Sequence, residues 1–400
     1  MIALASAGSA LEHEELLERV RHRLAEVPGQ LSPAVVAGAI RAEAGGVLGD
    51  TDLLGALRVL QTELSGAGPL EALLREPDTA DVLVTAPDEV WVDRGAGLVR
   101  AAVRFADEAA VRRLAQRLAL SAGRRLDEAQ PWVDGRLPDA GYGGAGVRLH
   151  AVLPPVAADG TTLSLRVLRP ATQGLDALVA SRAVPPEAGP LLEAVVAARL
   201  AFLVVGGTGA GKTTLLAALL ARVDARERIV CVEDAAELAP QHPHVVRLVA
   251  RAANIEGVGE VTVRQLVRQA LRMRPDRVVV GEVRGAEVVD LLTALNTGHD
   301  GGAGTVHANS PREVPARLEA LAALGGMDAP ALHSQLAAAV QVVLHVHRGS
   351  DGSRGLAAVG VLVRAVSGAV SVLPAWTRSG GAGAGWVTLT ELLAERGVQL

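Results

Sequence analysis

The sequence predicts an α/β fold: a domain built on a parallel β-sheet, preceded by a smaller α+β domain with a helical N-terminal extension. In the second half of the chain, short apolar runs alternate with helical segments, which is typical of a parallel sheet covered on both faces. In the first half, strand-like segments lie between amphipathic helices. A stretch rich in Pro, Gly and small residues, at 170–190, separates the two halves and indicates a domain boundary.

The first half divides into a helical extension at 1–64 and an α+β domain at 65–170. Apolar residues at helical spacing predict helices over 10–27, 33–45, 51–64, 69–76 and 107–122. Strands are predicted over 81–85, 89–93, 147–153 and 161–168.

The second half divides into a linker at 171–190, a parallel-sheet domain at 191–348 and a C-terminal appendage at 349–400. Its strands are predicted at 201–205, 228–232, 244–249, 277–281, 303–306 and 342–346, with two further strand-like pieces at 356–363 and 369–373. The segment Ala329–His347 lacks Asp, Glu, Lys and Arg, but it carries His and Gln and is mostly Ala and Val. A buried helix that runs into a strand explains this segment better than a membrane span does.

Composition excludes several classes of protein. A formal net charge of −5 and a pI near 6.1 argue against binding of nucleic acid through bulk charge, although a local basic patch stays open. The single cysteine, Cys231, excludes a disulfide framework and a Cys-based zinc site, and it suits a reducing compartment. The first 20 residues are rich in Glu and do not resemble a secretory signal, so we expect a cytoplasmic protein.

The segment GGTGAGKTT at 206–214 fits the phosphate-binding pattern G-x-x-x-x-G-K-[ST], with a predicted strand before it and a helix after it. Its glycines let backbone N–H groups point at phosphate oxygens, and the helix N-terminus adds positive potential. Lys212 is expected to reach the β- and γ-phosphates of ATP, and the Thr213 hydroxyl to ligate Mg²⁺. The residues expected to hold the nucleotide are Gly206, Gly207, Thr208, Gly209, Ala210, Gly211, Lys212, Thr213 and Thr214.

A chance Gly-rich turn is the alternative interpretation of this segment. Against it, Lys212 is the only lysine among the 39 basic residues of the chain, and it falls where the pattern requires one. Arginine is a wide planar fork and lysine a compact point charge, so a chain that otherwise uses arginine can still need the ammonium at this position.

Acidic residues follow two of the later predicted strands. Glu233 and Asp234 end one strand, and Glu282 ends another after four apolar residues, at the edge where α/β sheets place their ligands. A carboxylate there can hold the Mg²⁺ shell or orient an attacking water, whereas the alternative is an acid that caps the next helix. His299 and His307 flank a predicted short strand; either could sense the charge of a γ-phosphate, or be incidental.

Four segments together resemble the secretion-ATPase superfamily of type II and type IV secretion and pilus systems: GGTGAGKTT, VEDAAEL, LRMRPDRVVVGEVRG and NTGHDGGAGTVHANS. The closer resemblance is to the CpaF/TadA family of tight-adherence (Flp-type) pilus ATPases, and it covers about residues 66–348. It implies a RecA-like P-loop NTPase domain, joined by a mobile linker to the N-terminal domain, with ATP between the two. It also implies a homo-hexameric motor, peripherally associated with the cytoplasmic face of the inner membrane, that acts on platform proteins of a pilus or secretion system.

The resemblance also implies roles for individual residues. Glu282 matches the Walker B glutamate, which polarises water and helps to hold Mg²⁺, partly through water, and Glu233 matches the acidic-box carboxylate. His307 matches a histidine near the γ-phosphate. Arg148 and Arg166 match N-terminal-domain arginines that reach phosphate when the domains close, although an ordinary strand-end arginine is the alternative.

Other functions stay open at this stage. A DNA-translocating or conjugation-type RecA-like ATPase would share these motifs, but the acidic composition and scarce aromatics make contact with nucleic acid unexpected. A nucleotide-binding scaffold with an inactive site is disfavoured because the motifs are intact. Arg264, Arg268 and Arg272 recur every four residues on a predicted helix, where a solvated face or intersubunit ion pairs are the simpler interpretation.

Overall fold

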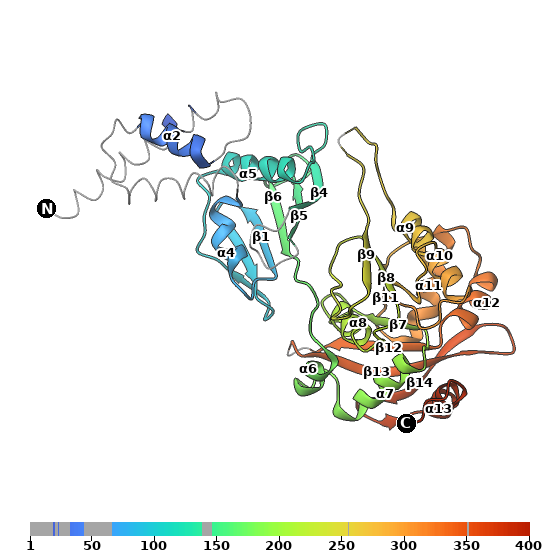
Figure 1. Cartoon of the computed structure of the whole chain (residues 1–400). Helices are drawn as coiled ribbons and strands as arrows, with labels where there is room; N and C mark the ends of the chain where they lie inside the picture. Colours follow the sequence, from blue (N-terminus) through green and yellow to red (C-terminus); the bar gives the residue numbers. More distant parts are fainter. Residues whose placement is uncertain are drawn as a thin grey trace. The chain divides into compact units, whose positions relative to one another are not determined.

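The computed structural model describes residues 19–20, 23, 33–43, 66–137, 146–254, 256–349 and 352–400. Contacts divide the chain into two compact units, Met1–Leu168 and Arg169–Leu400 (Figure 1). Helix α2 (Pro33–Glu43) confirms the predicted helix at 33–45. The helix predicted at 51–64, and nearly all of that at 10–27, lie outside the described residues.

The N-terminal unit contains an antiparallel sheet with the strand order β3-β2-β1-β6-β5-β4. The strands are β1 (Asp81–Ala86), β2 (Glu89–Asp93), β3 (Leu98–Arg100), β4 (Trp132–Leu137), β5 (Val147–Val152) and β6 (Thr162–Val167). The helices are η1 (Gly68–Leu70), α4 (Glu71–Arg75) and α5 (Glu108–Ser121). Within the described residues of this unit, the strands predicted at 81–85, 89–93, 147–153 and 161–168 and the helices predicted at 69–76 and 107–122 are confirmed. Strands β3 and β4 are additional: β3 is short, and β4 interrupts its apolar residues with Asp, Gly and Arg.

Helix α5 covers one face of this sheet. Its N-terminus is capped by Asp107, whose carboxylate accepts a hydrogen bond from the Ala110 amide at 2.7 Å. Its buried positions Val111, Leu114 and Leu118 are spaced by three and four residues and pack in the same core as the inward-facing strand residues. The other sheet face is polar, as the alternating burial along β5 and β6 requires.

The C-terminal unit is built on a larger sheet, with the strand order β15-β14-β13-β12-β7-β11-β10-β8-β9. The strands are β7 (Phe202–Gly206), β8 (Ile229–Glu233), β9 (Val245–Val249), β10 (Arg277–Val283), β11 (Ala303–His307), β12 (Val342–Arg348), β13 (Arg354–Arg364), β14 (Val370–Thr377) and β15 (Gly381–Ala382). The helices are α6 (Leu175–Ala180), η2 (Pro186–Ala188), α7 (Gly189–Ala197), α8 (Lys212–Leu220), α9 (Val263–Ala270), α10 (Glu287–Leu295), η3 (Pro311–Glu313), α11 (Val314–Leu324), α12 (Ala329–Ala339) and α13 (Trp386–Glu395).

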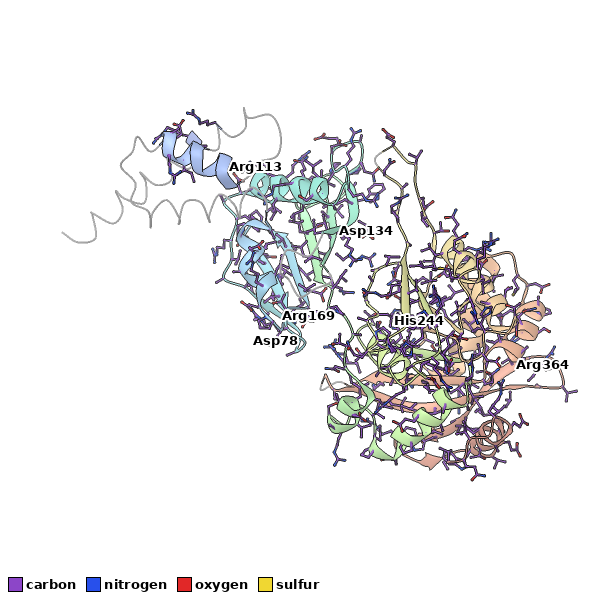
Figure 2. The ribbon with its side chains drawn as sticks, viewed as in Figure 1. Asp78, Arg113, Asp134, Arg169, His244 and Arg364 are labelled. Carbon is purple, nitrogen blue, oxygen red and sulfur yellow. The ribbon has the colours of Figure 1, made fainter. Side chains whose placement is uncertain are left out.

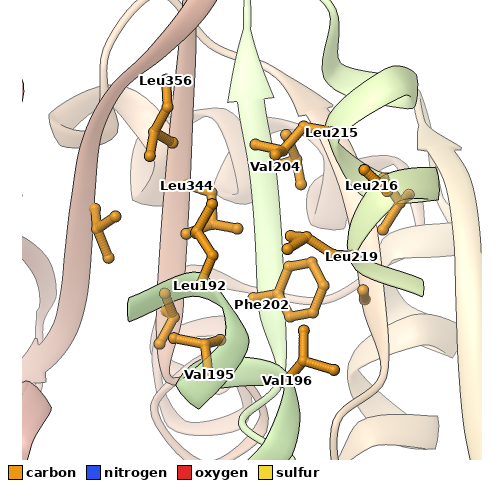
Figure 3. Close-up of a cluster of buried hydrophobic side chains, with 14 of the residues drawn as sticks. Leu192, Val195, Val196, Phe202, Val204, Leu215, Leu216, Leu219, Leu344 and Leu356 are labelled. Atoms are coloured by element: carbon orange, nitrogen blue, oxygen red, sulfur yellow. The ribbon is translucent and has the colours of Figure 1, made fainter. Parts of the chain in front are cut away.

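The run from β12 to β9 is parallel, as the apolar strands predicted. Successive residues of β7 point to opposite faces: Phe202 and Val204 enter one core, and Leu203 enters the other. Figure 3 shows Phe202 and Val204 among leucines of helix α8 and of the flanking elements. Because helices cover both faces, every position of β7 is buried, which explains its continuous apolar sequence.

The residues after 349, which the sequence suggests as an appendage, continue this large sheet. Strand β13 pairs antiparallel with β12, and β14 pairs with β13 (Figure 1). Val359 and Val361 of β13, and Leu389 of α13, belong to the same core as Phe202. The C-terminal segment therefore shares the core that supports β7.

The apolar segment Ala329–His347 forms helix α12 followed by strand β12, which confirms the prediction of a buried helix that runs into a strand. No helix among the described residues combines the length and the apolar character that crossing a membrane requires.

Candidate nucleotide-binding and catalytic site

The phosphate-binding loop connects β7 to α8, as predicted. Three of its glycines have positive φ: Gly206 at 158°, Gly209 at 68° and Gly211 at 96°. A side chain at Gly206 would collide with β12, because its Cβ would lie 2.3 Å from the Val346 carbonyl oxygen. The loop therefore depends on glycine both for its backbone conformation and for close packing on the neighbouring strand.

Lys212 is the first residue of α8, and it is 8% exposed. Its ammonium donates hydrogen bonds to the Gly206 and Gly207 carbonyl oxygens at 3.1 and 3.0 Å. Burial lowers the pKa of Lys212, and the charge of Glu282 opposes this shift. The ammonium thus lies inside the loop that would surround a phosphate.

The strand order brings the predicted catalytic residues to the same edge as the loop. His307 ends β11 and is in register with Gly206 at the end of β7, while Glu282 lies near the end of β10 on the other side of β11. His307 Nε2 lies 2.5 Å from Glu282 Oε1 and 3.2 Å from Lys212 Nζ. Three residues from three separate motifs therefore form one contact chain.

Burial lowers the pKa of His307, and the nearby Lys212 charge lowers it further, whereas Glu282 raises it. The imidazole is consequently neutral near pH 7, with one ring nitrogen that can donate a hydrogen bond. His299 does not join this cluster. Its Nδ1 lies 3.0 Å from the Ala294 carbonyl oxygen, and it precedes β11, whereas His307 ends this strand.

Glu233 ends β8 and is buried. Its Oε1 accepts hydrogen bonds from the Glu237 and Leu238 amides at 3.0 and 2.9 Å. Burial raises the pKa of Glu233 to about 7, against the lowering effect of these two hydrogen bonds. Gly281 on the adjacent β10 makes room for this side chain, since a Cβ there would lie 2.7 Å from Glu233 Cγ.

Arg284 is a site residue that the motif pattern did not assign. Its guanidinium contacts Glu282 Oε2 at 2.5 Å and Asp234 Oδ2 at 2.8 Å. A signal existed in the sequence: residues two apart on a strand share a face, and Arg284 follows Glu282 by two. Gly285 follows Arg284 and lies against Glu287, whose Oε1 accepts a hydrogen bond from the Gly285 amide at 2.8 Å.

The arginines on α9 serve a different purpose. Arg264 and Arg268 donate to the two carboxylate oxygens of Asp290 on α10, at 2.6 and 2.8 Å. Asp290 is 9% exposed, so both arginines neutralise a buried charge of their own chain. Arg272 lies beyond the end of α9, and its Nη1 donates to the Arg268 carbonyl oxygen.

The donor set fits a hard cation such as Mg²⁺ beside the loop. Two buried carboxylate oxygens face this site: Glu233 Oε2 has no hydrogen-bond partner in the described part of the chain, and Glu282 Oε1 contacts His307 Nε2 at 2.5 Å. A buried anionic oxygen without a donor is unfavourable, and oxygen ligands are those that Mg²⁺ prefers. Thr213, in the first turn of α8, adds a hydroxyl at the same edge.

A cavity of about 150 Å³ lies next to the loop, within the C-terminal unit. Ala210, Gly211 and Thr214 line it on the loop side. The rest of the lining includes apolar side chains from α6, α8 and β13, namely Leu178, Leu215 and Leu356, together with the polar Gln173 and Arg354. A mostly apolar cavity with a few polar groups is typical of a small-molecule site.

Arg148 and Arg166 lie side by side in the N-terminal unit, where they pair across β5 and β6 on the polar sheet face. Arg148 donates to Asp134 Oδ2 at 2.7 Å, and Arg166 donates to Asp81 Oδ1 at 2.8 Å. Figure 2 labels Asp134 on β4. The structure thus places both arginines on neighbouring strands, each paired with an Asp of its own unit, and their contact with phosphate stays a prediction.

Comparison with known proteins assigns the motifs to a family. Residues 63–353 match the family model described as type II/IV secretion system protein. A putative conjugal transfer protein of Mycobacterium tuberculosis strain H37Rv is 70% identical over 350 residues, which are 88% of this chain and 99% of that protein. The type IV secretion system protein VirB11 of Brucella suis biovar 1 is 30% identical over 317 residues, covering 72% of this chain and 86% of that protein.

Among solved structures, the chain is similar to the crystal structure of the VirB11 ATPase from the Brucella suis type IV secretion system in complex with sulphate. The two are 26% identical with a TM-score of 0.38, and the match covers 75% of this chain and 97% of the other.

Proposed function

Because this chain belongs to the type II/IV secretion system protein family, we propose that it is an ATP-hydrolysing motor of a secretion or pilus-assembly system. The observation that carries the proposal is the contact chain of Lys212, His307 and Glu282 beside the phosphate-binding loop. Lysine, neutral histidine and glutamate supply, respectively, a phosphate ligand, a hydrogen-bond donor and a water-orienting carboxylate.

In this proposal the loop amides and Lys212 bind the β- and γ-phosphates of ATP. The ammonium needs only to exchange its bonds to the Gly206 and Gly207 carbonyl oxygens for bonds to phosphate. The base of the nucleotide occupies the adjacent cavity, between Leu178 and Leu215, where the apolar lining excludes water and Gln173 offers a hydrogen-bonding amide.

The hydrolytic step falls to Glu282 and His307. Glu282 Oε1 is buried and contacts His307 Nε2 at 2.5 Å, and its second lone pair can accept a hydrogen bond from an attacking water and orient it. Neutral His307, whose Nε2 contacts Glu282 Oε1 at 2.5 Å, would exchange this contact to donate to a γ-phosphate oxygen as negative charge moves onto it. Mg²⁺, held by Thr213 and, partly through water, by Glu282, would neutralise phosphate charge.

The remaining parts of the proposal concern domain closure and the assembly of several subunits into a ring. Closure of the N-terminal unit would bring Arg148 and Arg166 to the phosphates, and a hexameric ring would transmit this closure to inner-membrane platform proteins. The finer assignment is to a tight-adherence (Flp-type) pilus ATPase, at the cytoplasmic face of the inner membrane, and it rests on the motif resemblance. Arg148 and Arg166 are suited to the role because a guanidinium can contact phosphate oxygens in bidentate fashion.

A conjugation-type, DNA-translocating ATPase is the second candidate. It is supported by the relatives named putative conjugal transfer protein and conjugal transfer protein TrbB. The candidates differ in their response to nucleic acid. A DNA motor hydrolyses ATP faster with single-stranded DNA and loses this stimulation as salt rises, whereas a pilus motor does not respond to DNA.

The proposed function is tested with Lys212→Ala and Glu282→Gln. Both variants should fold, and both should lose at least about 100-fold in ATP turnover. Lys212→Ala should also lose nucleotide binding, whereas Glu282→Gln should keep it, because Glu282 acts on the water. His299→Ala serves as the matched control and should turn over ATP at the wild-type rate. Turnover near the wild-type rate in Glu282→Gln would contradict the catalytic assignment.

A further inference from the structure

The Walker B glutamate is held by an arginine from its own strand end, and no motif assigns that arginine a function. We propose that Arg284 is a positioning residue: it ties Glu282 to the acidic box and leaves one carboxylate oxygen facing the attacking water. This inference rests on the proposed ATP hydrolysis and adds a residue to it.

The Arg284 guanidinium links two neighbouring strands through two ion pairs. Arg284 Nη2 lies 2.5 Å from Glu282 Oε2, and Arg284 Nη1 donates to Asp234 Oδ2 at 2.8 Å. Glu282 is on β10 and Asp234 directly follows β8, and these two strands are paired in parallel. A planar guanidinium can engage both carboxylates at once, which the single ammonium of a lysine does less well.

The backbone of Arg284 is fixed as well. Glu287, the first residue of α10, accepts hydrogen bonds at Oε1 from the Arg284 amide at 2.5 Å and from the Gly285 amide at 2.8 Å. The turn after β10 is therefore anchored to the start of the next helix. This anchor fixes the position from which the guanidinium reaches Glu282.

The two oxygens of Glu282 consequently differ. Oε2 is paired with Arg284, whereas Oε1 is buried and contacts His307 Nε2 at 2.5 Å, which leaves its second lone pair for a water. A glutamate held through one oxygen keeps its carboxylate from rotating and presents the other oxygen in a constant direction. Fixing a catalytic group in this way lowers the cost of reaching the transition state more than it strengthens binding of the substrate.

A purely structural ion pair is the competing explanation. The Arg284 side chain is 50% exposed and its Asp234 partner 39% exposed, and ion pairs at such sites contribute little to stability. If the pairs were only structural, their loss would change neither stability nor turnover appreciably. The positioning role predicts a selective loss of turnover in a normally folded protein.

The experiment compares ATP hydrolysis by wild type, Arg284→Gln and Arg284→Lys in the full-length chain with Mg²⁺. We expect Arg284→Gln to lower kcat by about 10- to 100-fold, with KM for ATP within about threefold of wild type. Arg284→Lys should recover part of kcat, because lysine can hold one of the two carboxylates. In a double-mutant cycle with Asp234→Asn, the two losses should be less than additive, because both variants break the same bridge.

The matched control is Arg226→Gln, since Arg226 pairs with Asp224 in the same unit but is 89% exposed. It should keep the wild-type kcat, and all variants should unfold within about 3 °C of wild type. A wild-type kcat in Arg284→Gln would overturn the positioning role, as would equal loss in Arg284→Gln and Arg226→Gln. Glu282→Gln in the same assay separates the two proposals: if it is inactive while Arg284→Gln is fully active, only the positioning role fails.

Discussion

The two ends of strand β10 carry the same kind of ion pair and use it differently. At the start of the strand, Arg277 donates through Nε and Nη2 to the Glu227 carboxylate at 2.8 and 3.2 Å. It also donates to the Val196 and Gly301 carbonyl oxygens, and its side chain is 2% exposed. At the other end, Arg284 pairs with Glu282, but its side chain is 50% exposed.

The difference lies in what each end leaves unsatisfied. Around Arg277, the guanidinium meets one carboxylate and two carbonyl oxygens, so the charge is neutralised within the chain. At the opposite end, Glu233 Oε2 has no hydrogen-bond partner among the residues described, and Glu282 Oε1 contacts the partly exposed His307. Parallel α/β sheets bind ligands at the carboxyl ends of their strands, and an unsatisfied carboxylate there is a place for a ligand rather than a flaw in packing.

We call the start of β10, around Arg277, the closed end, because its charges are neutralised within the chain, and the carboxyl end, around Arg284 and Glu282, the open end. The largest expected effect on stability comes from removing Arg277 at the closed end. Arg277→Met should lower the free energy of unfolding by about 3 kcal/mol, the lower part of the range for breaking a buried ion pair, because Glu227 keeps Arg199 as a partner at 3.3 Å. It also leaves the Val196 and Gly301 carbonyl oxygens without these donors. Denaturant unfolding followed by circular dichroism measures the loss.

Arg284→Met, at the open end, is the control for this comparison and should lower stability by less than about 1 kcal/mol. The comparison fails if the two variants lose equal stability. A second check is the double variant Arg277→Met with Glu227→Leu, which should recover part of the loss, because neither charge is then left buried without its partner.

The next effect concerns Glu233, at the carboxyl end of the neighbouring strand β8. Burial raises the pKa of Glu233 from 4.5 to about 7, so the folded protein disfavours the ionised form. The contribution of Glu233 to the free energy of unfolding is therefore greatest below about pH 4.5. It falls as pH rises through 7, by up to about 3 kcal/mol. The open end of the sheet thus destabilises the fold at the pH at which we expect it to function.

Glu233→Gln should remove this penalty. The amide oxygen can still accept the hydrogen bonds from Glu237 and Leu238, while the charge is lost. The variant should be more stable than wild type at pH 8 and equal to it at pH 4, as measured by denaturant unfolding at both values. If wild type and variant differed by the same amount at both pH values, Glu233 would not be the source of the pH dependence.

The sequence predicts the open end better than the closed end. The phosphate-binding segment, Glu233, Glu282 and His307 occur in short motifs, and parallel strands bring their carboxyl ends to one edge by rule. Lys212 is indicated both by this segment and by composition, because it is the only lysine of the chain. These are local signals, and a local signal can be read without knowing the tertiary contacts.

The closed end depends on contacts between distant segments. Arg277 binds Glu227, Gly301 and Val196, which lie 50, 24 and 81 residues away in the sequence. Glu227 and Val196 lie outside the motif segments, and the segment that contains Gly301 does not indicate this contact. Strand β4 also depends on a tertiary contact. Its Asp, Gly and Arg break the apolar alternation that would predict a strand, and its pairing with β5 is what forms it. Arg284 was missed although its spacing from Glu282 could have indicated it.

The smallest expected effect concerns the turn that supports the open end. Glu287→Gln keeps an oxygen that can accept the Arg284 and Gly285 amides, but it removes a negative charge from the first turn of α10. The charge favours the helix N-terminus by roughly 0.3–1 kcal/mol, so the variant should lose about that much stability. Because the turn keeps its hydrogen bonds, kcat should stay within about threefold of wild type. A loss of kcat as large as that of Arg284→Gln would show that the charge of Glu287, and not the anchored turn, sets the position of Arg284.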